Sequence, residues 1–116
     1  MKVTRERHDG TRYDFDFGVC AGRFGWAQVD TAADASWYGR WAHPTRLMVF
    51  SFTEGDTCLV ECRTAEEFRG ELRQMDSWHR ENHGRGIRID PGLVPAITRA
   101  FRELGLGDLL HPEPAA

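Results

Sequence analysis

The sequence contains few cysteines and no long apolar run. Its 116 residues include three cysteines, an odd and sparse set that is typical of reduced thiols in a cytosolic protein. No stretch approaches the roughly 20 consecutive apolar residues that a membrane-spanning helix needs. Residues 1–7 also lack the apolar segment of a secretory signal peptide. The sequence therefore predicts a cytoplasmic protein.

The spacing of the cysteines argues against a disulfide or a metal site. Cys58 and Cys62 are expected on one strand, where both point to the same face with Val60 between them. At that spacing they lie roughly 13 Å apart, too far for a disulfide or one shared ion. We expect these two to be buried core thiols, and Cys20, in a glycine-flanked loop, to be a surface thiol.

The charge is modest and unevenly distributed. Lysine is almost absent, with Lys2 against many arginines, and the formal net charge is -3. The middle of the chain is acidic and its last third is basic, but no uniformly basic face is predicted, which disfavours direct binding of nucleic acid. The acidic residues either form a solvated surface or face a basic partner.

A chain of this length forms one domain. We place that domain at residues 13–111, after a mobile segment at 1–12 and before a flexible tail at 112–116. The alternative for the first segment is a short hairpin closed at Asp9-Gly10.

Alternation and turn residues predict the strands. Aromatic residues alternate with aspartates over 13–17, which predicts a half-buried strand. A second strand at 24–29 is expected to pair antiparallel with the first. Residues 30–44 are expected to be an irregular loop, and two apolar runs at 46–53 and 57–63 are expected to form a central hairpin.

Two helices are expected after the hairpin. Thr64 with Glu67 forms a capping box, and Gly84 ends the first helix. The apolar stripe of this helix, expected to face the sheet, consists of Phe68, Leu72, Met75 and Trp78, or Trp78 with His79. Asp90 is the expected cap of the second helix, with Pro91 at its first position. Its apolar stripe consists of Val94, Ile97, Phe101 and Leu104, and Gly105 is expected to end it in a Schellman cap. With a short strand at 86–90 between the helices, the fold class is α+β. We expect a mostly antiparallel sheet of four to five strands with two helices packed on one face, in the order β-β-loop-β-β-α-β-α.

His79 and His83 are the weak candidates for a metal site. They lie four residues apart, with Asp76 one turn earlier, so that two imidazoles share one helix face. A closed zinc site needs four ligands, and polar residues near a helix C-terminus are the favoured interpretation. We also expect Asp76 to pair with Arg80 on the outer face. The alternative function is a small metal-dependent or hydrolytic enzyme that uses these histidines with Cys20 or Asp76; otherwise no cofactor and no catalytic residue is expected.

The aromatic segment in the expected loop is the favoured partner-binding candidate. Trp37, Tyr38 and Trp41 occur within five positions, together with Arg40. These are residue types that dominate protein interfaces. We expect one tryptophan to be buried and another exposed. The acidic flank of this patch consists of Asp30, Asp34, Glu54 and Asp56.

Several phrases along the chain resemble small uncharacterised proteins carried on plasmids and phages of high-GC proteobacteria. The similarity spans most of the chain from Tyr13 to His111, in the phrases at 13–18, 25–31, 38–44, 54–56 and 78–84. It implies no assigned activity and no catalytic residues. As a class, small non-enzymatic proteins of mobile elements often act against host defences, which implies an anti-CRISPR-like inhibitor.

The sequence hypothesis is therefore a binding protein that blocks a CRISPR-Cas effector subunit or nuclease by occlusion, with an acidic surface that mimics DNA phosphates. Replacing Trp37 and Trp41 by alanine is expected to abolish binding and to keep the fold cooperative. The chain is expected to be a monomer or a homodimer, with an unpaired sheet edge as the contact of a dimer.

Overall fold

The computed structural model describes residues 2–6, 12–16, 25–30, 38–53 and 56–111. They form seven strands, two α-helices and one 3₁₀ helix. The elements are β1 Lys2–Glu6, β2 Arg12–Asp16, β3 Ala27–Asp30, β4 Tyr38–His43, β5 Met48–Thr53, β6 Asp56–Glu61, α1 Ala65–His83, β7 Arg88–Asp90, α2 Pro95–Glu103 and η2 Gly107–Leu109.

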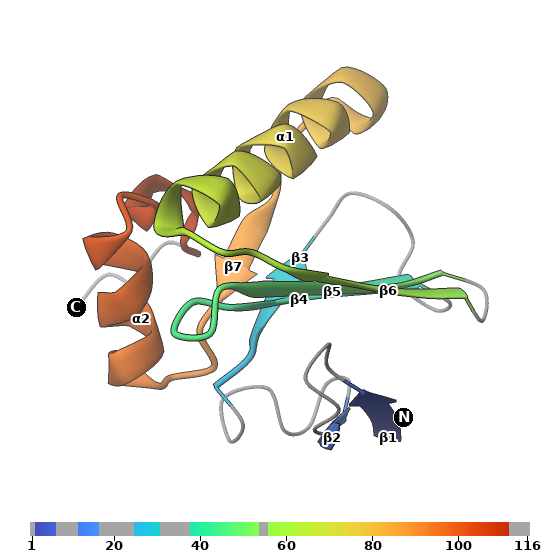
Figure 1. Cartoon of the computed structure of the whole chain (residues 1–116). Coiled ribbons are helices and arrows are strands. Elements are labelled where there is room, and N and C mark those ends of the chain that lie inside the picture. The colour runs from blue at the N-terminus through green and yellow to red at the C-terminus, as the bar shows by residue number, and fades with distance from the viewer. Residues whose placement is uncertain (1, 7–11, 17–24, 31–37, 54–55, 112–116) are drawn as a thin grey trace.

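A five-stranded sheet is the centre of the fold. Its strand order is β6-β5-β4-β3-β7, and every neighbouring pair is antiparallel. Helix α1 lies over one face of this sheet, and the separate β1–β2 hairpin lies on the other side (Figure 1). The predicted α+β class, with an antiparallel sheet and two helices, is confirmed.

Both helices share one core with the helix side of the sheet. Directly opposed residues of antiparallel strands point to the same face, and the register aligns Ala27, Ala42, Val49 and Val60 across four strands. Apolar residues of α1 and α2 close this core, and the rings of Phe68 and Phe101 lie 6.3 Å apart. The helix stripes expected from the sequence therefore meet the sheet.

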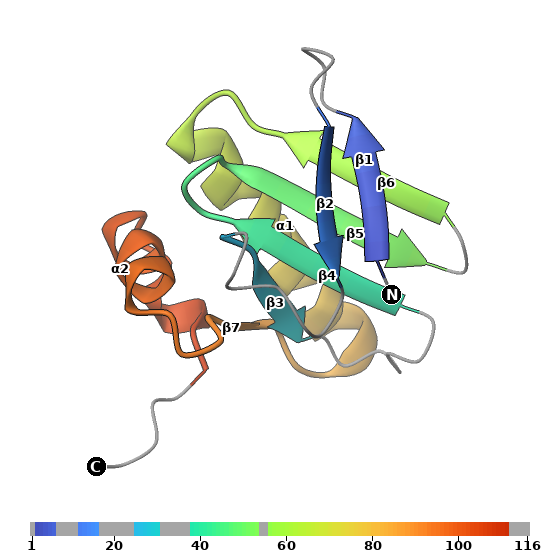
Figure 2. The same ribbon diagram turned by 90° about the horizontal axis from the view of Figure 1, so that it is seen from below.

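The opposite face of the sheet carries a second set of buried aromatic and sulfur-containing side chains. Trp41 is paired with Phe50 across β4 and β5, and these two residues are 1% and 0% exposed. Trp26, His43 and Met48 are buried as well. The β1–β2 hairpin crosses this face (Figure 2). The sheet is thus covered from both sides, by α1 on one and by the hairpin on the other.

The ends of α1 follow the predicted capping chemistry. The Thr64 hydroxyl accepts a hydrogen bond from the Glu67 amide at 3.1 Å, and the Glu67 carboxylate accepts one from the Arg63 amide at 2.8 Å. Gly84 ends the helix with φ 78°, a left-handed conformation that glycine adopts without steric cost.

The pairing predicted for the first two strands is wrong. Strand β2 pairs with β1, and β3 pairs with β4 and β7. Residues 2–6, expected to be mobile, supply the partner strand in the hairpin that was the alternative. The turn of that hairpin and the tail at 112–116 lie outside the described residues. Alternation identifies a strand but not its neighbour, because any strand with an apolar face fits the same pattern.

The segment expected to be a loop contains a strand. Residues 38–43 form β4, in the middle of the sheet between β3 and β5. Gly39 does not interrupt it and pairs with Phe52, and Pro44 directly follows its end. The strand has a polar residue on the helix side at Arg40 and a buried tryptophan on the other side, so its sequence lacks the usual alternation of apolar and charged residues.

The second helix begins later than predicted. Its N-cap is Val94, with Pro95 at the first helical position. The Asp90 carboxylate instead accepts a hydrogen bond from the Gly92 amide at 2.9 Å, which closes a turn before the helix. At the other end, Gly105 with φ 76° and the bond from the Leu106 amide to the Phe101 carbonyl, at 2.9 Å, form the predicted Schellman cap.

Among the described residues, no helix combines the length and the apolar character needed to cross a bilayer.

Candidate binding groove beside the long helix

A groove runs along one side of α1, above the sheet. Its volume is about 330 Å³, and its described lining residues are Arg40, Glu71, Gln74, Met75 and Trp78. We call it the α1 groove. It combines a guanidinium group, a carboxylate, an amide, a thioether and an indole, which are groups suited to binding a mixed polar and apolar surface. These five residues include no pair of nucleophile and base.

Strand register places Arg40 in this groove. Arg40 is opposite Val29 on β3 and Ser51 on β5, and Val29 is buried on the helix side. Opposed residues share a face, so the Arg40 side chain also extends toward α1. Four lining residues come from α1 itself, at spacings of three and four residues that keep them on one side of the helix.

Three of the predicted partner-binding residues meet at one end of the sheet. Tyr38 is paired with Thr53, which is paired in turn with Asp56. Arg40 lies two residues along β4 from this row. The register thus brings Tyr38, Arg40 and Asp56 to the end of the sheet next to the α1 groove, although they are up to 18 positions apart in sequence.

Trp41 does not belong to that surface. It follows Arg40 in β4 and therefore points to the opposite face, where it is 1% exposed. Its assignment to an exposed partner-binding patch is wrong, because the expected loop is a strand that buries every second residue. Asp30 forms an ion pair with Arg85 at 3.4 Å. Trp37, Asp34 and Glu54 lie outside the described residues.

The exposed aromatic side chain of the described surface is Trp78, which the sequence interpretation placed in the buried stripe. Trp78 is 50% exposed. The buried stripe runs through Phe68, Leu72, Met75 and His79, so Trp78 lies about 100° around the helix from its last member. Counted from Phe68 at 3.6 residues per turn, position 79 lies closer to the buried side of the helix than position 78 does. This spacing is the signal in the sequence that could have identified Trp78 as exposed.

The two histidines do not form a metal site with the described residues. His79 is fully buried and His83 is exposed, and their rings stack with centroids 5.4 Å apart. No group of three or more potential metal ligands occurs in the described part of the chain. Trp78 contacts both rings edge-on, at 4.9 and 5.4 Å. The histidines thus support the packing of one wall of the α1 groove.

His79 gives the fold a pH dependence. Its pKa is lowered, first by burial and then by the positive charges of Arg40, His83 and Arg85, which outweigh the opposing effect of Asp76. The unfolded chain takes up this proton near pH 6.5, whereas the folded chain resists it. As the pH falls from 7 to 5, this group should therefore lower the free energy of unfolding.

Urea denaturation at several pH values tests this prediction. His79→Gln should flatten the slope of stability between pH 7 and pH 5. His83→Gln, which removes one of the charges that lower the pKa of His79, should flatten this slope less than His79→Gln does. Equal slopes in His79→Gln and the unsubstituted chain would contradict the prediction.

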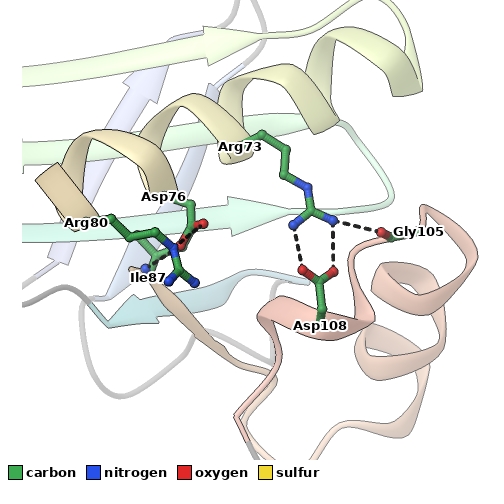
Figure 3. Close-up of polar contacts among 6 residues, drawn as sticks. All are labelled: Arg73, Asp76, Arg80, Ile87, Gly105 and Asp108. Atoms are coloured by element: carbon green, nitrogen blue, oxygen red, sulfur yellow. Dashed lines mark hydrogen bonds and ion pairs between the residues drawn. The ribbon is translucent and has the colours of Figure 1, made fainter. Parts of the chain in front are cut away.

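Asp76 is a buried structural group and not the outer-face residue that the sequence predicted. Its carboxylate accepts hydrogen bonds from Arg80 Nε at 3.0 Å and from the Ile87 amide at 2.9 Å (Figure 3). The predicted pair with Arg80 is present, but Asp76 is only 8% exposed. Its second oxygen ties α1 to the segment that leads into β7.

A second polar contact joins α1 to the end of the chain. Arg73 forms two hydrogen bonds with the Asp108 carboxylate, at 2.6 and 2.8 Å, and donates to the Gly105 carbonyl at 3.2 Å (Figure 3). The bond to Arg73 holds the pKa of Asp108 below its usual value. Together with Asp76, this contact fixes the side of α1 that faces away from the groove.

The cysteines behave differently from the prediction of two core thiols. Cys58 is exposed and Cys62 is partly buried. Burial, with the nearby charges of Glu71 and Glu67, raises the pKa of Cys62, so this thiol stays protonated and weakly nucleophilic. Cys58 lies on β6 at the edge of the sheet, which is why its face is not covered. Cys20 lies outside the described residues.

No family model matches the chain, and no significant match occurs among curated proteins or solved structures.

Proposed function

We propose that this chain is a non-enzymatic binding protein that inhibits a bacterial defence effector of the CRISPR-Cas type by occlusion, and that the α1 groove is its principal contact surface. The observation that carries the proposal is the half-exposed Trp78 beside Arg40 in a groove of about 330 Å³. Tryptophan and arginine are the side chains that contribute most to protein interfaces. Full burial of the exposed half of an indole by a partner would contribute on the order of 1–2 kcal/mol.

The surroundings of the groove favour a basic partner. Glu66 and Glu67 are exposed in the first turn of α1, and Glu71 lines the groove. Asp56 begins the edge strand β6 at the adjoining end of the sheet. Negative charge along this side speeds encounter with a positively charged surface and raises specificity. In an effector, such a surface is the channel that binds nucleic acid, so the acidic side would take the place of DNA phosphates.

The class of the partner rests on the resemblance to small proteins of mobile elements, whereas the surface rests on the described residues. The function places the protein in the cytoplasm. It needs no cofactor and no catalytic residue. Of the residues predicted from the sequence, we include Arg40 in the proposed surface. Tyr38 and Asp56 are candidates for its end, because strand register brings them to the same end of the sheet.

Affinity capture from lysates of bacteria that carry CRISPR systems tests the proposal. We expect an effector subunit or nuclease to co-purify stoichiometrically with the tagged chain. Gln74→Arg, which adds a long cationic side chain to the groove, should reduce that recovery at least tenfold. The matched control is Gln28→Arg, because Gln28 is also exposed but lies on the opposite face of the sheet. Equal loss in both variants, or capture of no effector component, would contradict the proposal.

A further inference from the structure

One leucine has a conformation and an exposure that the fold does not explain. Leu93 lies in the turn between β7 and α2, with φ 61°, and its side chain is 95% exposed. A bulky apolar residue rarely adopts a left-handed conformation, because its Cβ approaches the backbone carbonyl. Asparagine or glycine would form this turn with less strain. The strained backbone therefore presents a leucine side chain to solvent.

The turn that presents Leu93 is held by local hydrogen bonds. The Gly92 amide donates to the Asp90 carboxylate at 2.9 Å, and the Val94 amide donates to the Pro91 carbonyl at 3.1 Å. Pro91 and Pro95 restrict the backbone on either side. A side chain on such a preorganised turn loses little conformational entropy when it binds.

Leu47 provides a comparison within the same chain. It has nearly the same conformation, with φ 57°. Its side chain, however, packs against the main core, and its carbonyl accepts a hydrogen bond from the Cys62 amide at 2.9 Å. Packing thus offsets the strain at Leu47. Leu93, which is 95% exposed, has no such packing against the described core.

We propose that Leu93 docks into the α1 groove of a second copy of this chain. Trp78 and Leu93 are the two large apolar side chains that are exposed on the described surface. Trp78 lines a concave site, whereas Leu93 lies on an exposed turn, so the turn can enter the groove of another copy. The turn between β7 and α2 and the C-terminal half of α1 lie on opposite sides of the molecule (Figure 1). A chain therefore does not fill its own groove, and the contact forms between copies.

Size and charge agree with this occupant. The groove, at about 330 Å³, lies within the range of roughly 300–1,000 Å³ of sites that hold small ligands. It is large enough for a leucine side chain with part of Val94. Arg88 and Asp90, both exposed, precede the turn, and the groove carries Arg40 and Glu71. Arg88 before the turn and Glu71 in the groove carry opposite charges, which can pair across the contact.

The contact is heterologous, because a different surface of each copy takes part. Such contacts extend into open chains unless the geometry closes a ring. One anchoring side chain gives weak association, with a dissociation constant of about 0.1–1 mM. Self-association would occupy the same groove that the proposed partner uses, but the inference does not depend on the identity of that partner.

Sedimentation equilibrium between about 10 µM and 2 mM tests the inference. The unsubstituted chain should associate progressively, and L93N and Q74R should each remain monomeric. An equimolar mixture of these variants is the decisive sample. L93N retains an intact groove and Q74R retains an intact Leu93, so the mixture should form heterodimers but no longer chains.

The controls separate docking from folding. L93N should raise the unfolding temperature by about 4 °C, because asparagine tolerates the left-handed backbone. Q28R should associate like the unsubstituted chain. An unsubstituted chain that stays monomeric at 2 mM, a mixture that stays monomeric while the unsubstituted chain associates, or unchanged association of L93N would each overturn the inference. A CRISPR-type effector that binds L93N normally would leave it intact, because that result concerns the proposed function alone.

Discussion

Gly86→Ala is expected to lower the free energy of unfolding by about 3 kcal/mol. Gly86 is buried at the point where the chain returns from α1 to β7. A Cβ atom added there would collide with the Asp76 carboxylate and would lie 2.8 Å from Arg80 Nε. Asp76 would have to move, and the Ile87 amide and the buried carboxylate would then lose their hydrogen bond. An unsatisfied buried carboxylate is among the costliest single defects.

Gly70→Ala is the matched control for this prediction. Gly70 is exposed in the N-terminal half of α1, and no atom beyond its chain neighbours and the adjoining helix backbone lies within 4 Å of the Cβ position. The same substitution should therefore stabilise the chain there by about 1 kcal/mol, because alanine favours the helix over glycine. Urea denaturation of both variants measures the difference. Similar stabilities of the two variants would show that Gly86 tolerates a side chain and that Asp76 does not hold the return to β7.

Trp41→Ala is expected to destabilise the fold by about 3–5 kcal/mol, enough to unfold a marginally stable domain. The side chain is 1% exposed on the sheet face opposite α1, beside the buried Phe50. Its removal would leave a large cavity between the sheet and the β1–β2 hairpin. The sequence led us to expect that replacing Trp37 and Trp41 together would keep the fold cooperative and remove only partner binding. The burial of Trp41 predicts instead that any variant without this side chain loses stability.

The comparison with Trp78→Ala makes this second prediction specific. Trp78 is half-exposed, and its removal should cost less than about 1.5 kcal/mol. Circular dichroism during thermal unfolding should show a cooperative transition for Trp78→Ala and a lost or strongly shifted transition for Trp41→Ala. A cooperative transition of Trp41→Ala within a few degrees of the unsubstituted chain would contradict the buried position of Trp41.

Local signals in the sequence predict much of this fold. The hydroxyl of Thr64, the carboxylate of Glu67 and the glycine at 84 define α1 because each acts within a few residues. The central hairpin and the Schellman cap at Gly105 are local in the same way. The start of α2 was misplaced because two prolines, Pro91 and Pro95, both fit a first helical position.

The remaining differences depend on contacts between distant residues. Strand β2 pairs with β1, and β3 pairs with β7. The alternation of apolar and polar residues shows that a segment is a strand, but it does not determine which other strand becomes its neighbour. Strand β4 was missed because both of its sides are covered, which removes the alternation that marks a half-buried strand. The exposure of Trp78 depends on where α1 crosses the sheet. The sequence therefore identified one residue of the candidate site, Arg40, from its residue type. It did not show that the site lies beside α1.

An infection assay tests the central claim, that the chain inhibits a defence effector through the α1 groove. Cells with an active CRISPR system would express the unsubstituted chain, Q74R or Q28R and be challenged with a phage that the system targets. We expect that the unsubstituted chain and Q28R raise the plating efficiency of the phage by at least a hundredfold, and that Q74R loses this effect at equal protein abundance. Equal plating efficiency with and without the unsubstituted chain, across the major effector types, would contradict the claim.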